Sequence, residues 1–124
     1  MSVLRHTFPT THRLHGAAAF AAVYDAGIRE ARGPLAAFVR ANALDHPRLG
    51  LSVSRRVGTA VQRNRIKRLL REAFRMMQHD FPAAYDLVLA VRPHRALALA
   101  DYQKILTALI ARLHQKNTLR TPLR

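Results

Sequence analysis

The sequence predicts an α+β sandwich in which helices pack on a small sheet and the elements follow the order α-β-β-β-α-β-α. Two segments, 60–77 and 97–114, carry apolar residues at the three- and four-residue spacing of an amphipathic helix. Two others, Leu49–Ser54 and Tyr85–Val91, alternate apolar with small residues or are continuously apolar, which is typical of strands. At 124 residues the chain suits one domain, covering 1–124.

The chain begins with a basic segment, Met1–Arg13, which has no periodicity and is expected to form an extended arm. Phe8 and Pro9 are the one apolar anchor within it. The first helix is expected at Ala17–Ala26, because Gly27 follows it in the position that favours a left-handed C-cap.

Three strands are expected next. A short edge strand, Ile28–Arg32, ends at a Gly-Pro pair, and Leu35–Ala43 forms the second strand. An Asp-His-Pro turn then leads to Leu49–Ser54, whose alternation makes it the clearest strand of the chain.

The second half of the chain is expected to hold two helices and one strand. The first of these helices spans Ala60–Met77 and is strongly basic, and His79–Ala84 forms a loop before the buried strand Tyr85–Val91. Leu97–His114 is the last amphipathic helix, and Asn117–Arg124 is expected to be a frayed basic tail.

The helix at 60–77 separates apolar from cationic side chains. At about 100° per residue, one broad arc contains Ile66, Leu69, Leu70, Ala73, Phe74, Met76 and Met77. The opposite arc contains Asn64, Lys67, Arg68, Arg71 and Arg75, with Arg63 and Arg65 at its borders. Like charges at this spacing repel, and only Glu72 dilutes the row, so we expect an anionic partner. A phosphate backbone fits rigid guanidinium groups best, whereas a solvated face without a partner is the alternative.

The overall charge supports the same interpretation. The chain has 21 Lys and Arg against 7 Asp and Glu, a formal net charge of +14, which favours a nucleic-acid partner over an anionic membrane surface. The absence of cysteine excludes disulfides and Cys-based zinc sites. No apolar run approaches the roughly 18 residues of a membrane span, and the alanine-rich segment 16–23 makes a poor signal peptide. We therefore expect a cytoplasmic protein.

No catalytic residue, metal ligand or small-molecule site is predicted. The acids are scattered, and no Gly-rich phosphate loop is present. His6, His12 and His15 are close together in the sequence but poorly spaced for a metal ion. A protein-only nuclease that uses two histidines stays open as an alternative.

Three aromatic residues, Phe20, Tyr24 and Phe38, are placed to form a surface between the first helix and the sheet. Unpaired bases stack on such side chains, with about 1–3 kcal/mol for each stack. Phe20 and Tyr24 also share one helical stripe with Val23, so ordinary core packing is the alternative.

The residues from Leu49 to Arg75 read LGLSVSRRVGTAVQRNRIKRLLREAFR, a strand, a basic turn and a helix that opens with Arg-Asn-Arg. This stretch closely resembles the protein subunit of bacterial ribonuclease P. The resemblance extends to FPTTHRL near the start, to NALDHPRLG before the third strand, and to the apolar strand that ends in AVRP. Small departures are Arg55 and Arg56, where lysines are common, Thr59, where Asn is usual, and Leu35, where the family often has an aromatic residue.

The resemblance implies a protein that assembles with a large catalytic RNA, the holoenzyme removing the 5′ leader from precursor tRNA. Hydrolysis would be carried out by the RNA with Mg²⁺, and the protein would supply no catalytic group. The implied fold is similar to domain 2 of ribosomal protein S5, with a mixed sheet. Its parallel strands, Leu49–Ser54 and Tyr85–Val91 here, would be joined by a left-handed crossover through the basic helix, against the general right-handed rule.

The resemblance also implies two sets of site residues. Contacts with the catalytic RNA would come from Arg55, Arg56, Arg63, Asn64, Arg65, Lys67, Arg68, Arg71 and Arg75. The cleft for the leader would be lined by Phe20, Tyr24, Phe38, Ser52, Ser54 and Arg56. A ribosomal or other structural RNA-binding protein and a membrane-active cationic helix are the alternatives that use the same helix.

Overall fold

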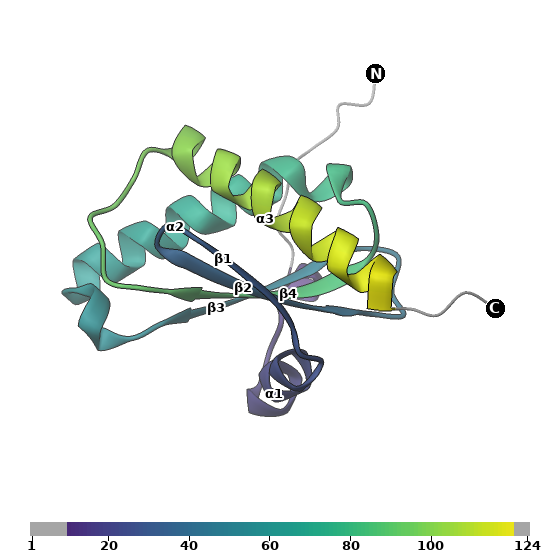
Figure 1. Cartoon of the computed structure of the whole chain (residues 1–124). Helices are drawn as coiled ribbons and strands as arrows, with labels where there is room; N and C mark the ends of the chain where they lie inside the picture. Colours follow the sequence, from purple (N-terminus) through teal and green to yellow (C-terminus); the bar gives the residue numbers. More distant parts are fainter. Residues whose placement is uncertain (1–9, 121–124) are drawn as a thin grey trace, which may run out of the picture.

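The computed structural model describes residues 10–120, which form a four-stranded sheet with three α-helices (Figure 1). The helices are α1 (Ala17–Asp25), α2 (Ala60–Met77) and α3 (Leu99–Arg120). The strands are β1 (Ile28–Arg32), β2 (Leu35–Ala41), β3 (Arg48–Val53) and β4 (Tyr85–Val91). These elements follow one another in the predicted order. Short 3-10 helices add Thr10–His12, Arg55–Val57 and Gln78–Asp80.

The sheet is mixed, as the resemblance implies, with the strand order β1-β2-β4-β3. β2 pairs antiparallel with both β1 and β4, whereas β3 pairs parallel with β4. Because β3 and β4 are parallel neighbours, the chain must cross from the end of one to the start of the other, and α2 makes this crossover. Its left-handed sense stays a prediction.

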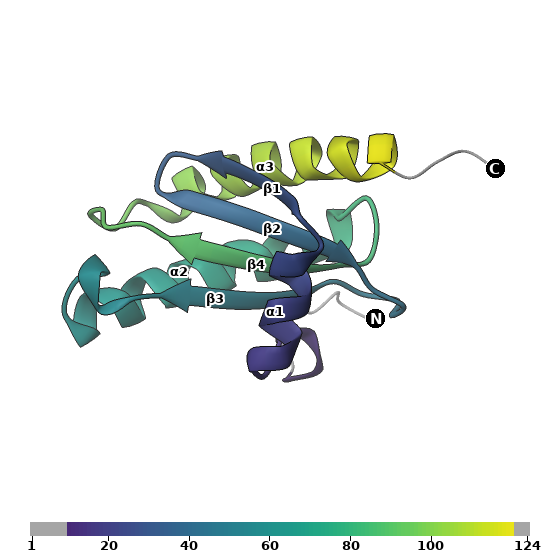
Figure 2. The ribbon, with the colours of Figure 1, turned by 60° about the horizontal axis from the view of Figure 1, so that its bottom comes forward.

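The helices lie in two layers on opposite faces of the sheet. Figure 1 shows α2 and α3 together on one face and α1 alone on the other. In the rotated view of Figure 2, α1 crosses the strands instead of running along them. The sheet therefore separates the basic helix α2 from the aromatic residues carried by α1.

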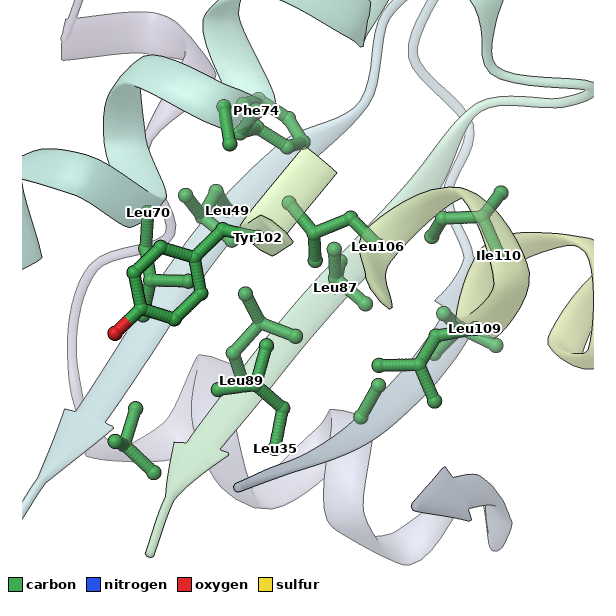
Figure 3. Packing of buried hydrophobic residues seen from close by; sticks show 14 of the residues in the cluster. Leu35, Leu49, Leu70, Phe74, Leu87, Leu89, Tyr102, Leu106, Leu109 and Ile110 are labelled. Atoms are coloured by element: carbon green, nitrogen blue, oxygen red, sulfur yellow. The ribbon is translucent and has the colours of Figure 1, made fainter. Parts of the chain in front are cut away.

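The larger core lies between the sheet and the pair α2 and α3 (Figure 3). It is formed by Leu35, Leu49, Leu87 and Leu89 of the sheet, Leu70 and Phe74 of α2, and Tyr102, Leu106, Leu109 and Ile110 of α3. Full burial of one such aliphatic or Phe side chain contributes about 1.5–3 kcal/mol. A smaller cluster of Leu14, Val23 and Val88, joined by Ala19, Phe20 and Phe38, holds α1 to the other face.

The start of α2 is fixed by a capping box. The Gln62 amide nitrogen donates to Thr59 Oγ1 at 3.2 Å, and the Thr59 amide nitrogen donates to Gln62 Oε1 at 2.8 Å. Gly58, at φ 154°, precedes the cap, and a Cβ there would collide with the Gln62 side-chain oxygen. The predicted bounds of this helix are confirmed, since local chemistry alone starts it at Ala60.

The second strand is shorter than predicted. β2 ends at Ala41 instead of Ala43: the Asn42 amide nitrogen still donates to the Ala84 carbonyl at 3.1 Å, but the Asn42 side chain accepts a bond from the Leu44 amide nitrogen at 2.9 Å and turns the chain. This local bond is an Asx turn, which competes with strand pairing. β3 begins and ends one position earlier than predicted, at Arg48–Val53.

The last helix is longer than predicted. α3 begins at Leu99 instead of Leu97 and continues past His114 to Arg120. Residues Asn117–Arg120, expected in a frayed tail, are therefore helical.

Part of the predicted N-terminal arm is ordered. Thr10–His12 form a 3-10 helix, Arg13 makes a parallel bridge with Leu49, and the Leu14 amide nitrogen donates to the Leu49 carbonyl at 2.9 Å. This pairing had no periodic signal in the sequence because only a single bridge forms. The predicted anchor at Phe8 and Pro9 lies outside the described residues.

Candidate nucleic-acid interface

Two surfaces contain the residues singled out from the sequence. The basic ridge consists of Arg55, Arg56, Arg63, Asn64, Arg65, Lys67, Arg68, Arg71 and Arg75, from the 3-10 helix before α2 and from α2 itself. The aromatic surface consists of Phe20, Tyr24 and Phe38 on the α1 face of the sheet. Ser52, Ser54 and Arg56 lie along and beyond the end of β3, between these two surfaces.

The core orients the basic ridge. Ile66, Leu70, Ala73 and Phe74 are buried, so the opposite side of α2 has to face solvent. Asn64, Arg65 and Arg68 are exposed, and Arg63, Lys67, Arg71 and Arg75 are half-buried. The two predicted arcs are confirmed with one exception. Met76 is 41% exposed, because it lies at the edge of the apolar arc.

Only one member of the basic ridge is neutralised by an acid in the described part of the chain. Arg75 Nε donates to Glu72 Oε1 at 3.0 Å, and its Nη2 donates to the second carboxylate oxygen. The hydrogen bond from Arg75 lowers the pKa of Glu72. Within residues 10–120, the other cations of the ridge form no ion pair with an acid: these are Arg55, Arg56, Arg63, Arg65, Lys67, Arg68 and Arg71. The ridge therefore keeps most of its charge.

The ridge continues toward the α1 face around the edge of β3. A hollow of about 190 Å³ is lined there by Arg13, His15, Phe20 and Arg71 together with residues of β3. Burial, followed by the nearby charge of Arg13, lowers the pKa of Arg71. Arg13 and His15 were not among the predicted site residues. Arg13 is the last residue of the segment expected to be an extended arm and His15 follows it, and the sequence carried no signal that would bring either residue to α2.

The aromatic surface is built on one row of residues across the sheet. Gly50 and Phe38 both pair with Val88, and Arg29 pairs with Phe38. The Phe20 ring lies directly over Gly50, where an added Cβ would be 2.6 Å from a ring carbon. Phe20 is therefore largely a packing residue.

Tyr24 and Phe38 form the more accessible part of the aromatic surface. Their rings meet edge to face with centroids 4.8 Å apart, and the Arg29 guanidinium lies 5.4 Å from the Phe38 centroid. Tyr24 is 37% exposed. Ring surface and a cation therefore lie together on this face, a combination that single-strand-binding proteins use.

The three polar residues predicted beside the aromatic surface are not all on the sheet. Ser52 is exposed on the α1 face, in register with Ala90 of β4. Ser54 follows β3, and its carbonyl accepts a bond from the Val57 amide nitrogen at 3.1 Å. Arg56 is exposed in the 3-10 helix that leads into α2. Ser54 and Arg56 thus connect the aromatic surface with the basic ridge.

Histidines form a separate cluster at the opposite end of the strands. The rings of His12 and His46 lie 3.9 Å apart, and His12 Nδ1 bonds with Gln78 Oε1 at 3.1 Å. Burial, followed by His46, lowers the pKa of His12. Of the N-terminal histidines discussed from the sequence, His6 lies outside the described residues. No group of three or more His, Cys, Asp or Glu within residues 10–120 is arranged to hold a metal ion.

None of the described helices combines the length and the apolar character that crossing a bilayer would need.

Comparison with known proteins gives one consistent family. Residues 8–116 match the model of the family described as Ribonuclease P. The ribonuclease P protein component of Desulfovibrio desulfuricans is 34% identical over 113 residues, which cover 90% of this chain and 87% of that protein. The same component of Methylococcus capsulatus is 42% identical over 87 residues, covering 69% of this chain and 68% of that protein.

Solved structures agree. The RNase P protein of Staphylococcus aureus superposes with a TM-score of 0.71 at 31% identity, covering 81% of this chain and 93% of that one. The RNase P protein of Thermotoga maritima gives a TM-score of 0.73 at 28% identity, covering 81% of this chain and 96% of that one.

Proposed function

Because this chain belongs to the ribonuclease P protein family, we propose that it assembles with a catalytic RNA and helps it to remove the 5′ leader from precursor tRNA. Membership makes it a component of an endoribonuclease complex. The finer assignment, to two RNAs bound on two surfaces, rests on the geometry described above.

The observation that carries the proposal is the charge of the basic ridge. Seven cations of α2 and of the 3-10 helix before it have no acidic partner among the described residues: Arg55, Arg56, Arg63, Arg65, Lys67, Arg68 and Arg71. Their mutual repulsion costs stability in the free protein, and a polyphosphate would relieve it. We assign this ridge to the catalytic RNA, since a helix of fixed shape suits a folded RNA that is recognised through its backbone.

The aromatic surface is assigned to the leader of precursor tRNA. The rings of Tyr24 and Phe38 lie on this surface. Beside them the sheet carries a row of small side chains, Ala36, Ala90 and Ser52. Small side chains leave room for an RNA strand to approach the sheet. A single-stranded leader, with its bases unpaired, matches this surface better than a duplex does.

In this proposal the protein binds and orients the two RNAs, and the catalytic groups belong to the catalytic RNA. Mg²⁺, bound mainly by the RNA, would supply the charge stabilisation and the activated water for hydrolysis. The protein's cations reduce the repulsion between two polyanions that have to meet. Precursor tRNA is a cytoplasmic substrate in bacteria, so we expect the protein to act in the cytoplasm.

Reconstitution with the ribonuclease P RNA of the same organism tests the proposal. Adding the chain should lower the Mg²⁺ concentration that half-maximal cleavage requires, and it should raise the affinity for precursor over mature tRNA. Cleavage by the chain without the RNA would show a protein-only nuclease instead. Equal binding of precursor and mature tRNA, with no effect on cleavage, would favour the alternative of a structural RNA-binding protein.

A further inference from the structure

A second basic hollow lies where the loop after β4 passes the start of α2. Both segments are at the same end of the molecule in Figures 1 and 2. The hollow measures about 450 Å³ and is lined by Val57, Gln62, Arg65, Ile66, His94, Arg95 and Ala96. Val57 and Ile66 are buried, while Arg65, on the wall formed by α2, and Arg95, on the wall formed by the loop, are exposed.

The loop wall is held in place by a chain of hydrogen bonds. His94 Nδ1 lies 2.8 Å from the Arg92 carbonyl oxygen, which can only accept, so this nitrogen carries the proton. His94 Nε2 lies 2.7 Å from the Tyr102 hydroxyl oxygen, and the Leu97 amide nitrogen donates to the same hydroxyl at 3.2 Å. Both ring nitrogens of His94 and the Tyr102 hydroxyl therefore have hydrogen-bond partners.

Tyr102 anchors the loop in the core. Its ring is fully buried among leucines of the sheet and α2, with the hydroxyl oxygen at the margin of the cluster (Figure 3). Burial raises the pKa of Tyr102, against the smaller opposing effects of the Leu97 amide and the charge of Arg65. Arg95 therefore projects from a loop whose position is fixed relative to Arg65.

The helix wall is equally rigid. Gln62 belongs to the capping box with Thr59, and Arg65 follows one turn later on the same helix. Neither Arg65 nor Arg95 forms an ion pair with an acid in the described part of the chain. Two exposed cations from separate segments thus line one hollow without an acid of the described chain to neutralise them.

We propose that Arg65 and Arg95 bind one stretch of phosphate backbone of the catalytic RNA between them, so that the loop 92–98 is part of the RNA interface. One guanidinium group can donate two parallel hydrogen bonds to phosphate oxygens. Two such groups, one on α2 and one on the loop, would fix the direction of the RNA strand between them. The hollow adjoins the basic ridge through Arg65 and lies on the face of the sheet opposite α1, away from the aromatic surface. The catalytic RNA therefore fits it better than the leader does. This inference rests on the proposed function.

The test is a binding series with the ribonuclease P RNA of the same organism over a range of salt concentrations. Arg95→Ala and Arg65→Ala should each weaken binding and lower the slope of log K against log salt by up to about 0.9, the value for one phosphate contact. The double variant should lose less than the sum of the two, because both residues bind the same strand. Arg112→Ala is the matched control, an exposed arginine near Glu30 of β1 that should leave affinity close to wild type.

A second variant tests the positioning role of Tyr102. Tyr102→Phe removes the hydroxyl and no charge, so it should weaken RNA binding in the wild-type background and have no further effect in the Arg95→Ala background. A loss of melting temperature that is the same in both backgrounds, without any change in RNA affinity, would assign the hydroxyl to stability alone and contradict this role.

The outcomes separate the inference from the proposed function. If Arg65→Ala weakens RNA binding while Arg95→Ala matches wild type in affinity and slope, the inference is wrong and the proposed function stands. If Arg95→Ala weakens only the binding of free precursor tRNA, the hollow belongs to tRNA and the inference is also wrong. If the wild-type chain does not bind the RNA, the proposed function itself fails.

Discussion

Gly50 determines how closely α1 can approach the sheet. The Phe20 ring occupies the space that a side chain at this position would need. We predict that Gly50→Ala destabilises the fold by about 1–3 kcal/mol, the usual cost of overpacking, as measured by urea denaturation. Adding Phe20→Leu, which removes the ring, should restore part of the loss. A Gly50→Ala protein as stable as wild type would mean that α1 can move away from the sheet without cost.

Asp86 shows how a charge can be buried inside this sheet. It is 3% exposed, accepts two bonds from Arg48, at 2.8 and 2.7 Å, and one from Asn42 at 2.9 Å. Burial alone would raise the pKa of Asp86, but the bonds from Arg48 and Asn42 outweigh burial and lower it below the ordinary 3.8. The ionised form is therefore the one that the fold stabilises.

This direction sets a pH dependence. Because the pKa of Asp86 is lower in the folded state, its contribution is complete above the unfolded value of 3.8 and is lost as pH falls through the folded pKa below it. Asp86→Asn should cost about 3 kcal/mol near neutral pH, and its difference from wild type should shrink below that pKa. Urea denaturation near neutral pH and again below the folded pKa measures the difference in unfolding free energy. Asp25→Asn, at an exposed position, is the control. A difference that does not depend on pH would contradict it.

Tyr24 and Phe20 occupy neighbouring places on α1 but should respond differently to truncation. Tyr24 is exposed, so Tyr24→Ala should reduce the preference for precursor over mature tRNA roughly 5- to 150-fold, equivalent to about 1–3 kcal/mol of stacking. Phe20→Ala should mainly lower stability, by about 3 kcal/mol, because Phe20 packs against Gly50. Competition binding and denaturation separate the two. If Tyr24→Ala lowered the affinity for precursor and mature tRNA equally, the assignment of the leader to the aromatic surface would be wrong.

At the scale of elements, α2 is the part of the chain in which sequence and structure agree most closely. Its cap, its length and its two faces all follow from residues within one stretch. The structure adds that Glu72 neutralises Arg75 and that Arg63 Nε donates to the Gly58 carbonyl at 3.2 Å. Arg65 and Arg68 are exposed and make neither kind of contact among the described residues, so they are the best choices for testing the ridge.

Replacing Arg65 and Arg68 together with Ala should weaken assembly with the catalytic RNA. The slope of log K against log salt should fall by up to about 1.8, near 0.9 for each lost phosphate contact. The matched control is the pair Lys104→Ala and Arg112→Ala, which removes the same charge from exposed positions of α3. Circular dichroism should show an unchanged helix content. If the control pair lost the same RNA affinity, binding would depend on the net charge of the protein and not on the position of the ridge.

α3 shows why element ends are harder to predict than element cores. The apolar spacing that predicted this helix stops at Leu113, so the sequence indicated an end near His114. Contacts from distant strands extend the helix: Lys116 Nζ donates to the Arg29 carbonyl at 2.6 Å, and the Tyr85 hydroxyl lies 2.7 Å from His114 Nδ1. Such contacts carry no local signal.

At the scale of the whole molecule, the same distinction separates what could be predicted from what could not. The order of elements and the two faces of α2 depend on neighbouring residues, and the structure confirms them. Arg13 and Arg71 line one hollow, and Arg65 and Arg95 line another. Both placements depend on how separate segments fold together. The family resemblance supplied the roles of the surfaces but not these two pairs. The RNA-binding roles of the predicted site residues stay predictions.

The placement of α1 and α2 on opposite faces of one sheet has a geometric consequence. With both RNAs bound as proposed, the protein acts as a spacer whose thickness is set by the close-packed side chains between the sheet and the helices on its two faces. Such a spacer cannot stretch as a flexible linker does. The gap between the two nucleic acids would then be the same for every substrate, whatever the base sequence of its leader, and the position of the cut would inherit that constancy.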